Sequence, residues 1–173
     1  MTAPCRVRDA KPSEFAHIGQ LMIAVYSALA GFPSPSEQPK YYEMLANIGK
    51  ITERPGTRLL AAVEDDAVLG AVVYFADMAQ YGSGGTATQE RRASGFRLLA
   101  VDPAAQGRGV GAALIERCIA QAREDGNGQV IIHSTAAMRT AWSMYERRGF
   151  VRSSDLDFMQ EALQVYGFRL ALG

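Results

Sequence analysis

The stretch "VDPAAQGRGVGAAL" spans residues 101–114 and places three glycines, Gly107, Gly109 and Gly111, in and around one short turn. It follows the apolar run "FRLLAV" and precedes a segment whose apolar residues recur every three or four positions. This order predicts a strand, a turn and an amphipathic helix. The first amide groups of such a helix have no partners within it, and the helix dipole makes this end positive. The stretch therefore predicts a place where an anion can contact bare main chain.

The spacing of the glycines excludes two better-known anion sites. The stretch lacks the Gly-Lys-Ser/Thr ending of a P-loop, and "GRGVGA" departs from the GxGxxG pattern of dinucleotide-binding oxidoreductases. Two interpretations stay open from spacing alone. The glycines let phosphate oxygens approach the main chain, with Arg108 adding a charge-assisted bond, or they only let helix and sheet pack closely.

The pattern around this stretch predicts one mixed α/β domain over residues 1–173. We expect strands at residues 6–9, on both sides of an Asp65-Asp66 hairpin turn, at 96–101, at 130–133 and in "FVRSS" and "QVYGFRLAL", and helices at about 12–30, 40–50, 110–124 and 138–148. The sheet is expected to be central, twisted and mostly antiparallel, with about six or seven strands and about four flanking helices. Residues 79–93, rich in glycine and polar side chains, are expected to form a mobile loop.

The balanced charge of the sequence limits the classes of molecule that the protein is expected to bind. The 173 residues carry 18 Lys and Arg against 18 Asp and Glu, and the pI is near 6.7, so no overall field favours nucleic acid or an anionic membrane. The apolar run "LMIAVYSALAG" is too short to span a bilayer, and Asp9 and Glu14 interrupt the basic segment that a signal peptide needs. Cys5 and Cys118 lie far apart without metal-ligand spacing, so we expect a cytoplasmic protein with no metal and no disulfide.

Two segments resemble motifs of the GNAT superfamily of N-acetyltransferases. "LAVDPAAQGRGVGAALIERCIAQAR" is similar to the cofactor motif Val-x-Pro-x-x-Gln/Arg-x-x-Gly-x-Gly/Ala, with its positions filled by Val101, Pro103, Gln106, Gly109 and Gly111. "AWSMYERRGF" is similar to the second motif of the superfamily, with its positions filled by Ala141, Met144, Tyr145, Gly149 and Phe150. Together the two motifs cover about residues 96–154.

The resemblance implies a site for acetyl-CoA (coenzyme A as acyl donor). Its pyrophosphate would rest on the main-chain amides of the turn, which belong to Gln106, Gly107, Arg108, Gly109, Val110 and Gly111. Its pantetheine arm would pair like an added strand with the main chain of Leu99, Ala100 and Val101, one of whose N–H groups would also polarise the acetyl carbonyl.

Tyr145 is, by the same resemblance, the general acid that hydrogen-bonds the coenzyme A sulfur. The alternative from the residues is that Tyr145 belongs to an apolar stripe with Met138, Ala141 and Trp142, and that its hydroxyl finds an ordinary partner. The family often has an asparagine that contacts the pantetheine arm at the position of Met138, so this contact is in doubt.

The general base is left open between Glu90, Asp77, His133 and a chain of waters, because the strand at 94–101 carries no carboxylate. His133 has an equally simple structural interpretation, and Glu90 has one as part of a solvated charge cluster. Neither cysteine suits a nucleophile, so we expect direct attack by the amine without a covalent acyl-enzyme.

The acceptor is expected to be the amine of a small molecule or a peptide. Aromatic residues before and after residue 30 could form a wall for it, namely Tyr26, Phe32, Tyr41 and Tyr42, together with Tyr81 of the 79–93 loop. The alternative function is a non-catalytic acyl-CoA-binding module or sensor. Edge-strand pairing by "QVYGFRLAL" would give a homodimer.

Overall fold

The computed structural model describes residues 5–173, which contain eight strands and four α-helices joined by short 3₁₀ helices. The strands are β1 (Arg6–Asp9), β2 (Thr57–Glu64), β3 (Ala67–Phe75), β4 (Ala93–Val101), β5 (Gln129–Ser134), β6 (Val151–Arg152), β7 (Phe158–Gln160) and β8 (Leu163–Ala171). The helices are α1 (Phe15–Ser27), α2 (Pro39–Ala46), α3 (Val110–Glu124) and α4 (Arg139–Arg147).

The strands hydrogen-bond in the order β1-β2-β3-β4-β5-β8-β6, with β7 paired to β8. The β4–β5 pair is parallel, whereas β5, β6 and β7 all run antiparallel to β8. The predicted fold class, a mixed and mostly antiparallel sheet with four α-helices, is therefore confirmed. The expected strand number was slightly too low, because three-residue β7 carries no pattern of its own. None of the helices in residues 5–173 is long and apolar enough to cross a membrane.

The chain forms two compact units and passes between them at Pro55–Thr57 and within β3, β4 and α3. The first unit comprises the chain up to Arg54, Arg58–Val73 and Leu98–Arg117, and the second comprises Pro55–Thr57, Tyr74–Arg97 and Cys118–Gly173.

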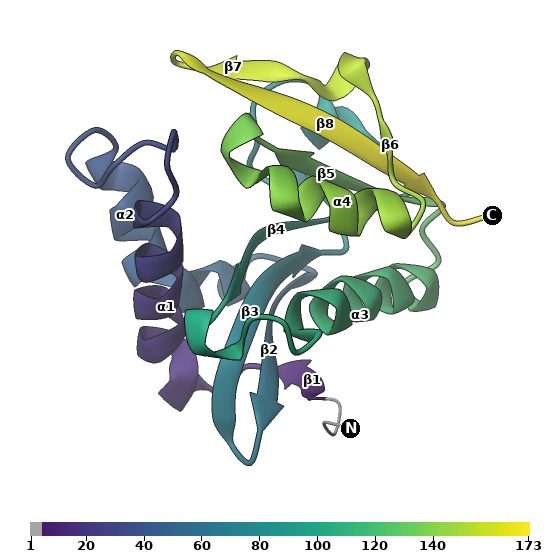
Figure 1. Ribbon diagram of the computed structural model, residues 1–173. Coiled ribbons are helices and arrows are strands. Elements are labelled where there is room, and N and C mark those ends of the chain that lie inside the picture. Colours follow the sequence, from purple (N-terminus) through teal and green to yellow (C-terminus); the bar gives the residue numbers. More distant parts are fainter. Residues whose placement is uncertain (1–4) are drawn as a thin grey trace. The chain divides into compact units, whose positions relative to one another are not determined.

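In the first unit, α1 runs beside α2 (Figure 1). Gly19 makes this close approach possible, because a Cβ there would lie 2.7 Å from the carbonyl oxygen of Leu45. Ile18, Met22 and Leu45 are completely buried at this contact. The β2–β3 hairpin turns at the predicted Asp65-Asp66 pair, whose φ angles of 49° and 66° suit a two-residue turn that follows the twist of the strands.

The start of α3 packs closely on β3 in the same unit. A Cβ on Gly70 would lie 2.8 Å from the Ala100 carbonyl oxygen and 2.9 Å from the Val110 side chain. Val110 and Leu114 are buried there, at the spacing expected for the apolar face of a helix. The first turn of α3 is thus fixed against the strands by its apolar side chains.

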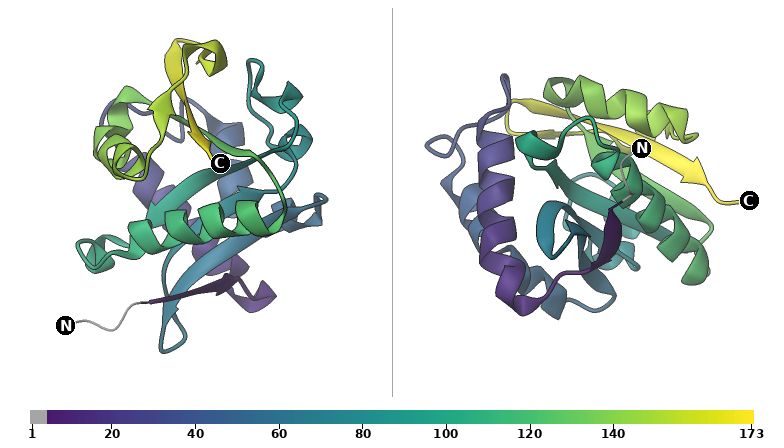
Figure 2. Two further views of the ribbon diagram at one scale, coloured as in Figure 1. Left: turned by 90° about the vertical axis from the view of Figure 1, so that its right-hand side faces the viewer. Right: turned by 60° about the horizontal axis from the view of Figure 1, so that its bottom comes forward.

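In the second unit, α4 lies against β5 and β8 (Figure 2). The Trp142 ring packs on Tyr166 and Phe168 of β8, each at 5.2 Å between centroids. Parallel pairing of β4 with β5 joins only three residues of each strand, Ala93–Gly95 with Gln129–Ile131.

A buried polar network connects the beginning of β4 to the end of α3. The Tyr74 hydroxyl donates to Asp125 Oδ2 at 2.6 Å and lies 2.7 Å from Ser94 Oγ. Asn127 Nδ2 donates to the same Ser94 oxygen at 2.6 Å. Burial, followed by the bond to Asp125, raises the pKa of Tyr74, so its hydroxyl remains a donor.

The start of α1 is held by an ion pair with β1. Arg8 Nη1 and Nη2 donate to Glu14 Oε1 and Oε2 at 2.9 and 3.0 Å, and the Lys11 N–H donates to Glu14 Oε1 at 2.8 Å. The bond from Arg8 is the main cause that lowers the pKa of Glu14 from 4.5 to about 2.

We predict that this pair makes stability depend on pH in a defined direction. The unfolded chain binds a proton at Glu14 before the folded chain does, so the contribution is complete above about pH 5 and is lost as pH falls towards 2. Glu14→Gln should lower the free energy of unfolding at pH 7 by about 1–3 kcal/mol, with a difference that shrinks on acidification. Urea unfolding at several pH values measures it, and a pH-independent difference would contradict it.

Candidate functional site

The glycine turn before α3 is exposed, and its main chain is left-handed at two positions. Gln106, Gly107, Arg108 and Gly109 are all exposed, and the φ angles of Gly107 and Gly109 are 80° and 79°. The first bond into the helix runs from the Ala113 N–H to the Gly109 carbonyl at 3.0 Å. The amides of residues 110–112 therefore precede the intrahelical bonding, and the first turn of α3 contains no acidic residue.

The surroundings of Gly107 and Gly109 argue against the interpretation that these two glycines serve close packing. If Gly107 and Gly109 served close packing, a Cβ at either position would meet neighbouring atoms. Apart from the residues next to each glycine in the chain, no atom of residues 5–173 lies within 4 Å of either Cβ position, so no distant part of the described chain packs against these residues. At these two positions glycine is required by the left-handed main chain and not by packing. The open side gives a ligand direct access to main-chain groups.

Arg108 does not point freely into solvent. Its Nη2 donates to Glu64 Oε2 at the end of β2, and the two side chains are 32% and 39% exposed. No local sequence pattern predicts this pairing, because the partners are 44 residues apart. Binding of a phosphate by Arg108 remains a prediction, and it requires the guanidinium to be shared with or released by Glu64.

The end of β4 departs from regular strand geometry. Leu98, which is buried, has a φ of 62°, a left-handed conformation that is strained for a residue with a Cβ. The next carbonyl, that of Leu99, accepts a hydrogen bond from the Tyr26 hydroxyl of α1 at 3.0 Å. The side chains of Leu99 and Val101 are partly exposed, and that of Ala100 is buried. No sequence signal marks this irregularity at Leu98.

Four of the five predicted aromatic residues form one cluster in the first unit, whereas Tyr81 lies in the second unit. The rings of Tyr26, Phe32 and Tyr41 lie 5.5 to 6.4 Å apart, and Tyr42 packs on Tyr41 at 5.5 Å. The Tyr42 hydroxyl donates to the Pro33 carbonyl at 2.6 Å, which ties the loop after α1 to α2. The bond from Tyr26 to Leu99 joins this cluster to β4. Aromatic side chains are thus held beside the irregular end of the strand.

Tyr145 lies in the second unit among aromatic rings. Its ring packs on Phe96 and Phe150, both at 5.9 Å, and on Phe168 at 6.3 Å. The residue is 5% exposed, and its hydroxyl makes no hydrogen bond within residues 5–173. Burial is the largest cause that raises the pKa of Tyr145, so the phenol keeps its proton at neutral pH. The aromatic packing fits the apolar stripe expected around Tyr145, and its role as general acid stays a prediction.

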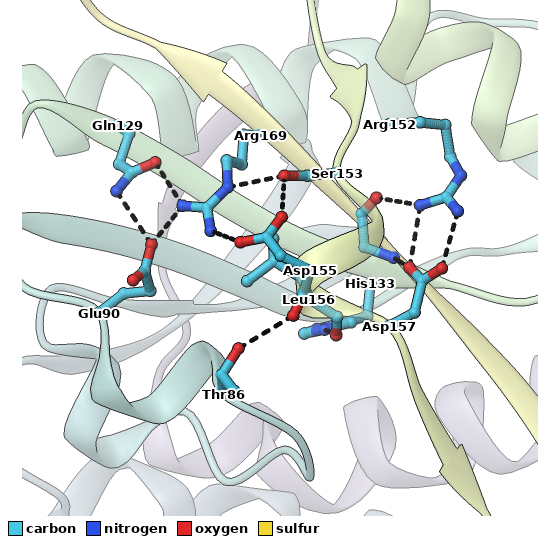
Figure 3. Close-up of polar contacts among 11 residues, drawn as sticks. Thr86, Glu90, Gln129, His133, Arg152, Ser153, Asp155, Leu156, Asp157 and Arg169 are labelled. Carbon is cyan, nitrogen blue, oxygen red and sulfur yellow. Dashed lines mark hydrogen bonds and ion pairs between the residues drawn. The ribbon is translucent and has the colours of Figure 1, made fainter.

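Two candidate bases, Glu90 and Asp77, are engaged in other interactions, and Figure 3 shows those of Glu90. Glu90 pairs with Arg169 of β8, whose guanidinium also bonds Gln129 Oε1 at 3.0 Å and Asp155. Asp77 is exposed, and its side chain accepts from the Ala79 N–H at 2.9 Å. Both carboxylates therefore have structural roles.

His133 uses both ring nitrogens. Nε2 lies 2.9 Å from the Leu156 carbonyl, which can only accept, so Nε2 carries the proton and Nδ1 accepts from the Tyr81 hydroxyl, also at 2.9 Å. Burial is the largest cause that lowers the pKa of His133, so the ring is neutral at pH 7. The lone pair of Nδ1 is therefore occupied by the hydrogen bond from the Tyr81 hydroxyl.

The 79–93 segment is an irregular loop that contains the 3₁₀ helix Ala87–Gln89, and several of its side chains anchor it within the second unit. Tyr81 and Ala87 are completely buried, and the Thr86 hydroxyl donates to the Asp155 carbonyl at 3.1 Å. Tyr81 also packs on Gly95, where a Cβ would lie 2.7 Å from the ring. Polar composition suggested a loop, but one buried tyrosine and side-chain bonds to distant residues fix the segment in place.

Comparison with known proteins agrees with this geometry. A family model for the Acetyltransferase (GNAT) family matches residues 22–150. No curated protein sequence matches the chain.

Solved structures share the fold over nearly the whole chain. A GNAT-family acetyltransferase from Staphylococcus aureus Mu50 has a TM-score of 0.74 at 14% identity, covering 97% of this chain and 99% of that one. The acetyltransferase YncA from Salmonella typhimurium, solved with acetyl-CoA, has a TM-score of 0.67 at 18% identity, covering 99% and 95%. A ribosomal-protein-alanine N-acetyltransferase from Brucella melitensis has a TM-score of 0.68 at 17% identity, covering 96% and 99%.

The matched region includes both the glycine turn and Tyr145 and spans well over half of the sequence. This chain belongs to the GNAT family of acetyltransferases.

Proposed function

We propose that residues 1–173 act as one domain that transfers an acetyl group from acetyl-CoA directly to an amine of a small molecule or peptide. The open, left-handed turn at Gly107 and Gly109 is the observation that carries the proposal. A related fold, YncA, was solved with acetyl-CoA, and another relative is named for a protein alanine acceptor. Neither relative determines the acceptor of this chain.

The residues present fit the donor. A diphosphate would accept hydrogen bonds from the amides of residues 106–111, where the helix dipole is positive and no acidic side chain lies in the first turn. The main chain of Leu99–Val101 would bind the pantetheine arm. Met138 has no side-chain hydrogen-bonding group to replace the family's asparagine, so we propose that main-chain groups carry most of this binding.

The reaction needs a proton for the departing sulfur. Tyr145 keeps its proton well into the alkaline range because its pKa is raised, and its hydroxyl has no competing partner within residues 5–173. A thiolate formed in the same buried surroundings is also poorly solvated, so transfer of the proton from Tyr145 relieves the charge on sulfur. We propose that Tyr145 is the general acid.

The described side chains also bear on the general base and on the acceptor amine. Glu90, Asp77 and His133 are each held by structural bonds, which favours a water chain as the route for the amine proton. The cluster of Tyr26, Phe32 and Tyr41 favours an acceptor with an apolar or aromatic group. A cytoplasmic location and a homodimer remain part of the proposal.

A non-catalytic acyl-CoA-binding module is the second candidate. It would need the glycine turn but would have no use for a buried tyrosine with an unbonded hydroxyl. Tyr145 therefore favours the enzyme.

The glycine turn gives the first test of the proposal. Gly109→Ala should weaken coenzyme A binding by about tenfold or more, because a left-handed alanine costs about 1–2 kcal/mol and distorts the amides. Gly126→Ala is a matched control, since Gly126 also has a positive φ, 75°, and open space beside it. Calorimetry should find equal loss of thermal stability in both variants but weaker binding only in Gly109→Ala. Equal coenzyme A affinity in the two variants would remove the turn from the site.

Tyr145→Phe gives the second test. The variant should bind coenzyme A normally and slow acetyl transfer about a hundredfold or more, because the general acid is lost while the ring packing is kept. Thiol release with a panel of aromatic, aliphatic and peptide amines measures the rate and identifies the acceptor. Unchanged turnover would exclude Tyr145 from the reaction, and binding of acetyl-CoA without transfer to any amine in the wild type would favour the non-catalytic module.

A further inference from the structure

Ser134, the last residue of β5, has a buried hydroxyl without a partner. The residue is 2% exposed, and its Oγ makes no hydrogen bond within residues 5–173. A buried hydroxyl without a partner costs stability, and nearly all such groups in folded proteins are bonded. A ligand atom that accepted a hydrogen bond from the Ser134 hydroxyl would remove this cost.

The register of β5 and β8 shows which way Ser134 faces. Ser134 is paired with Tyr166, and Ile132 is paired with Phe168. Directly paired residues of antiparallel strands point to the same face of the sheet. The rings of Tyr166 and Phe168 both contact Trp142, so Ser134 lies on the face that α4 covers.

Tyr145 leans towards the same end of β5. Side chains on a helix tilt towards its N-terminus, and the Trp142 Nε1–H donates to the Thr135 carbonyl at 3.0 Å, which fixes the N-terminal part of α4 beside the end of β5.

We propose that Ser134 is a second hydrogen-bond donor to the coenzyme A sulfur, beside Tyr145. The inference rests on the proposed function. The Ser134 hydroxyl is buried without a bond, and the Tyr145 hydroxyl has no bond within residues 5–173, so an acceptor placed between them would bond both. The neighbouring Thr135 also has an unbonded hydroxyl, but its extended main chain directs that side chain to the opposite face.

The chemistry of the transfer gives the two donors different tasks. As the bond between acetyl carbon and sulfur breaks, the electron pair stays on sulfur, and Tyr145 supplies the proton that makes the free thiol. Ser134 keeps its proton and donates a hydrogen bond that stabilises the developing negative charge on sulfur. Tyr145 regains its proton from solvent, while the acceptor nitrogen loses one.

Ser134→Ala tests the assignment with readouts that a structural role would not give. Because no protein bond is lost, the variant should be as stable as the wild type or more stable. The pKa of the thiol of bound coenzyme A, followed by the ultraviolet absorbance of the thiolate, should rise by about one unit, and kcat should fall about tenfold. Ser134→Thr, which keeps the hydroxyl, should restore the thiol pKa.

Thr57→Val is the matched control, because Thr57 also has a buried, unbonded hydroxyl but lies at the start of β2. It should leave both the thiol pKa and kcat unchanged. A Ser134→Ala variant with the wild-type thiol pKa and kcat would overturn the inference while leaving the proposed function intact. Failure of the wild type to bind coenzyme A would overturn both.

Discussion

The conformation of two glycines at the start of α3 is the constraint on which the account depends. Positive φ angles at Gly107 and Gly109 turn the chain from β4 into the helix, and no distant part of the described chain packs beside either glycine. The apolar residues Val110 and Leu114 fix the helix behind them, so the amides are held in place before any ligand arrives. A preorganised set of donors costs little entropy when an anion binds.

Irregular main chain and unbonded hydroxyl groups also occur along β4 and β5. Leu98 adopts a left-handed conformation inside a strand, and parallel pairing with β5 ends after three residues. At the end of β5 the Ser134 hydroxyl is buried without a protein bond, and the Tyr145 hydroxyl has no bond within residues 5–173. Strain and unbonded polar groups of this kind are tolerated where function uses them, whereas the Tyr74 and Arg169 networks satisfy their polar groups fully.

Local patterns in the sequence predicted much of this structure. Apolar periodicity located α3 and α4, and the Asp65-Asp66 pair located the hairpin turn, because these features depend on neighbouring residues. The glycine spacing predicted the exposed turn but could not separate a ligand site from close packing. That distinction needed the positions of atoms around Gly107 and Gly109. The pairing of Arg108 with Glu64, the bonds of His133 and the irregular Leu98 depend on partners far along the chain, so no local pattern contained them.

The central claim is that main-chain amides of the glycine turn bind the diphosphate of the donor. Titration of ¹⁵N-labelled protein with coenzyme A, followed by amide NMR, tests it most directly. The account predicts that the amide signals of Gly107, Gly109 and Gly111 all shift as coenzyme A is added. Their shifts should level off at the same coenzyme A concentration as the overall binding curve. Saturable binding that leaves these three signals in place would contradict it.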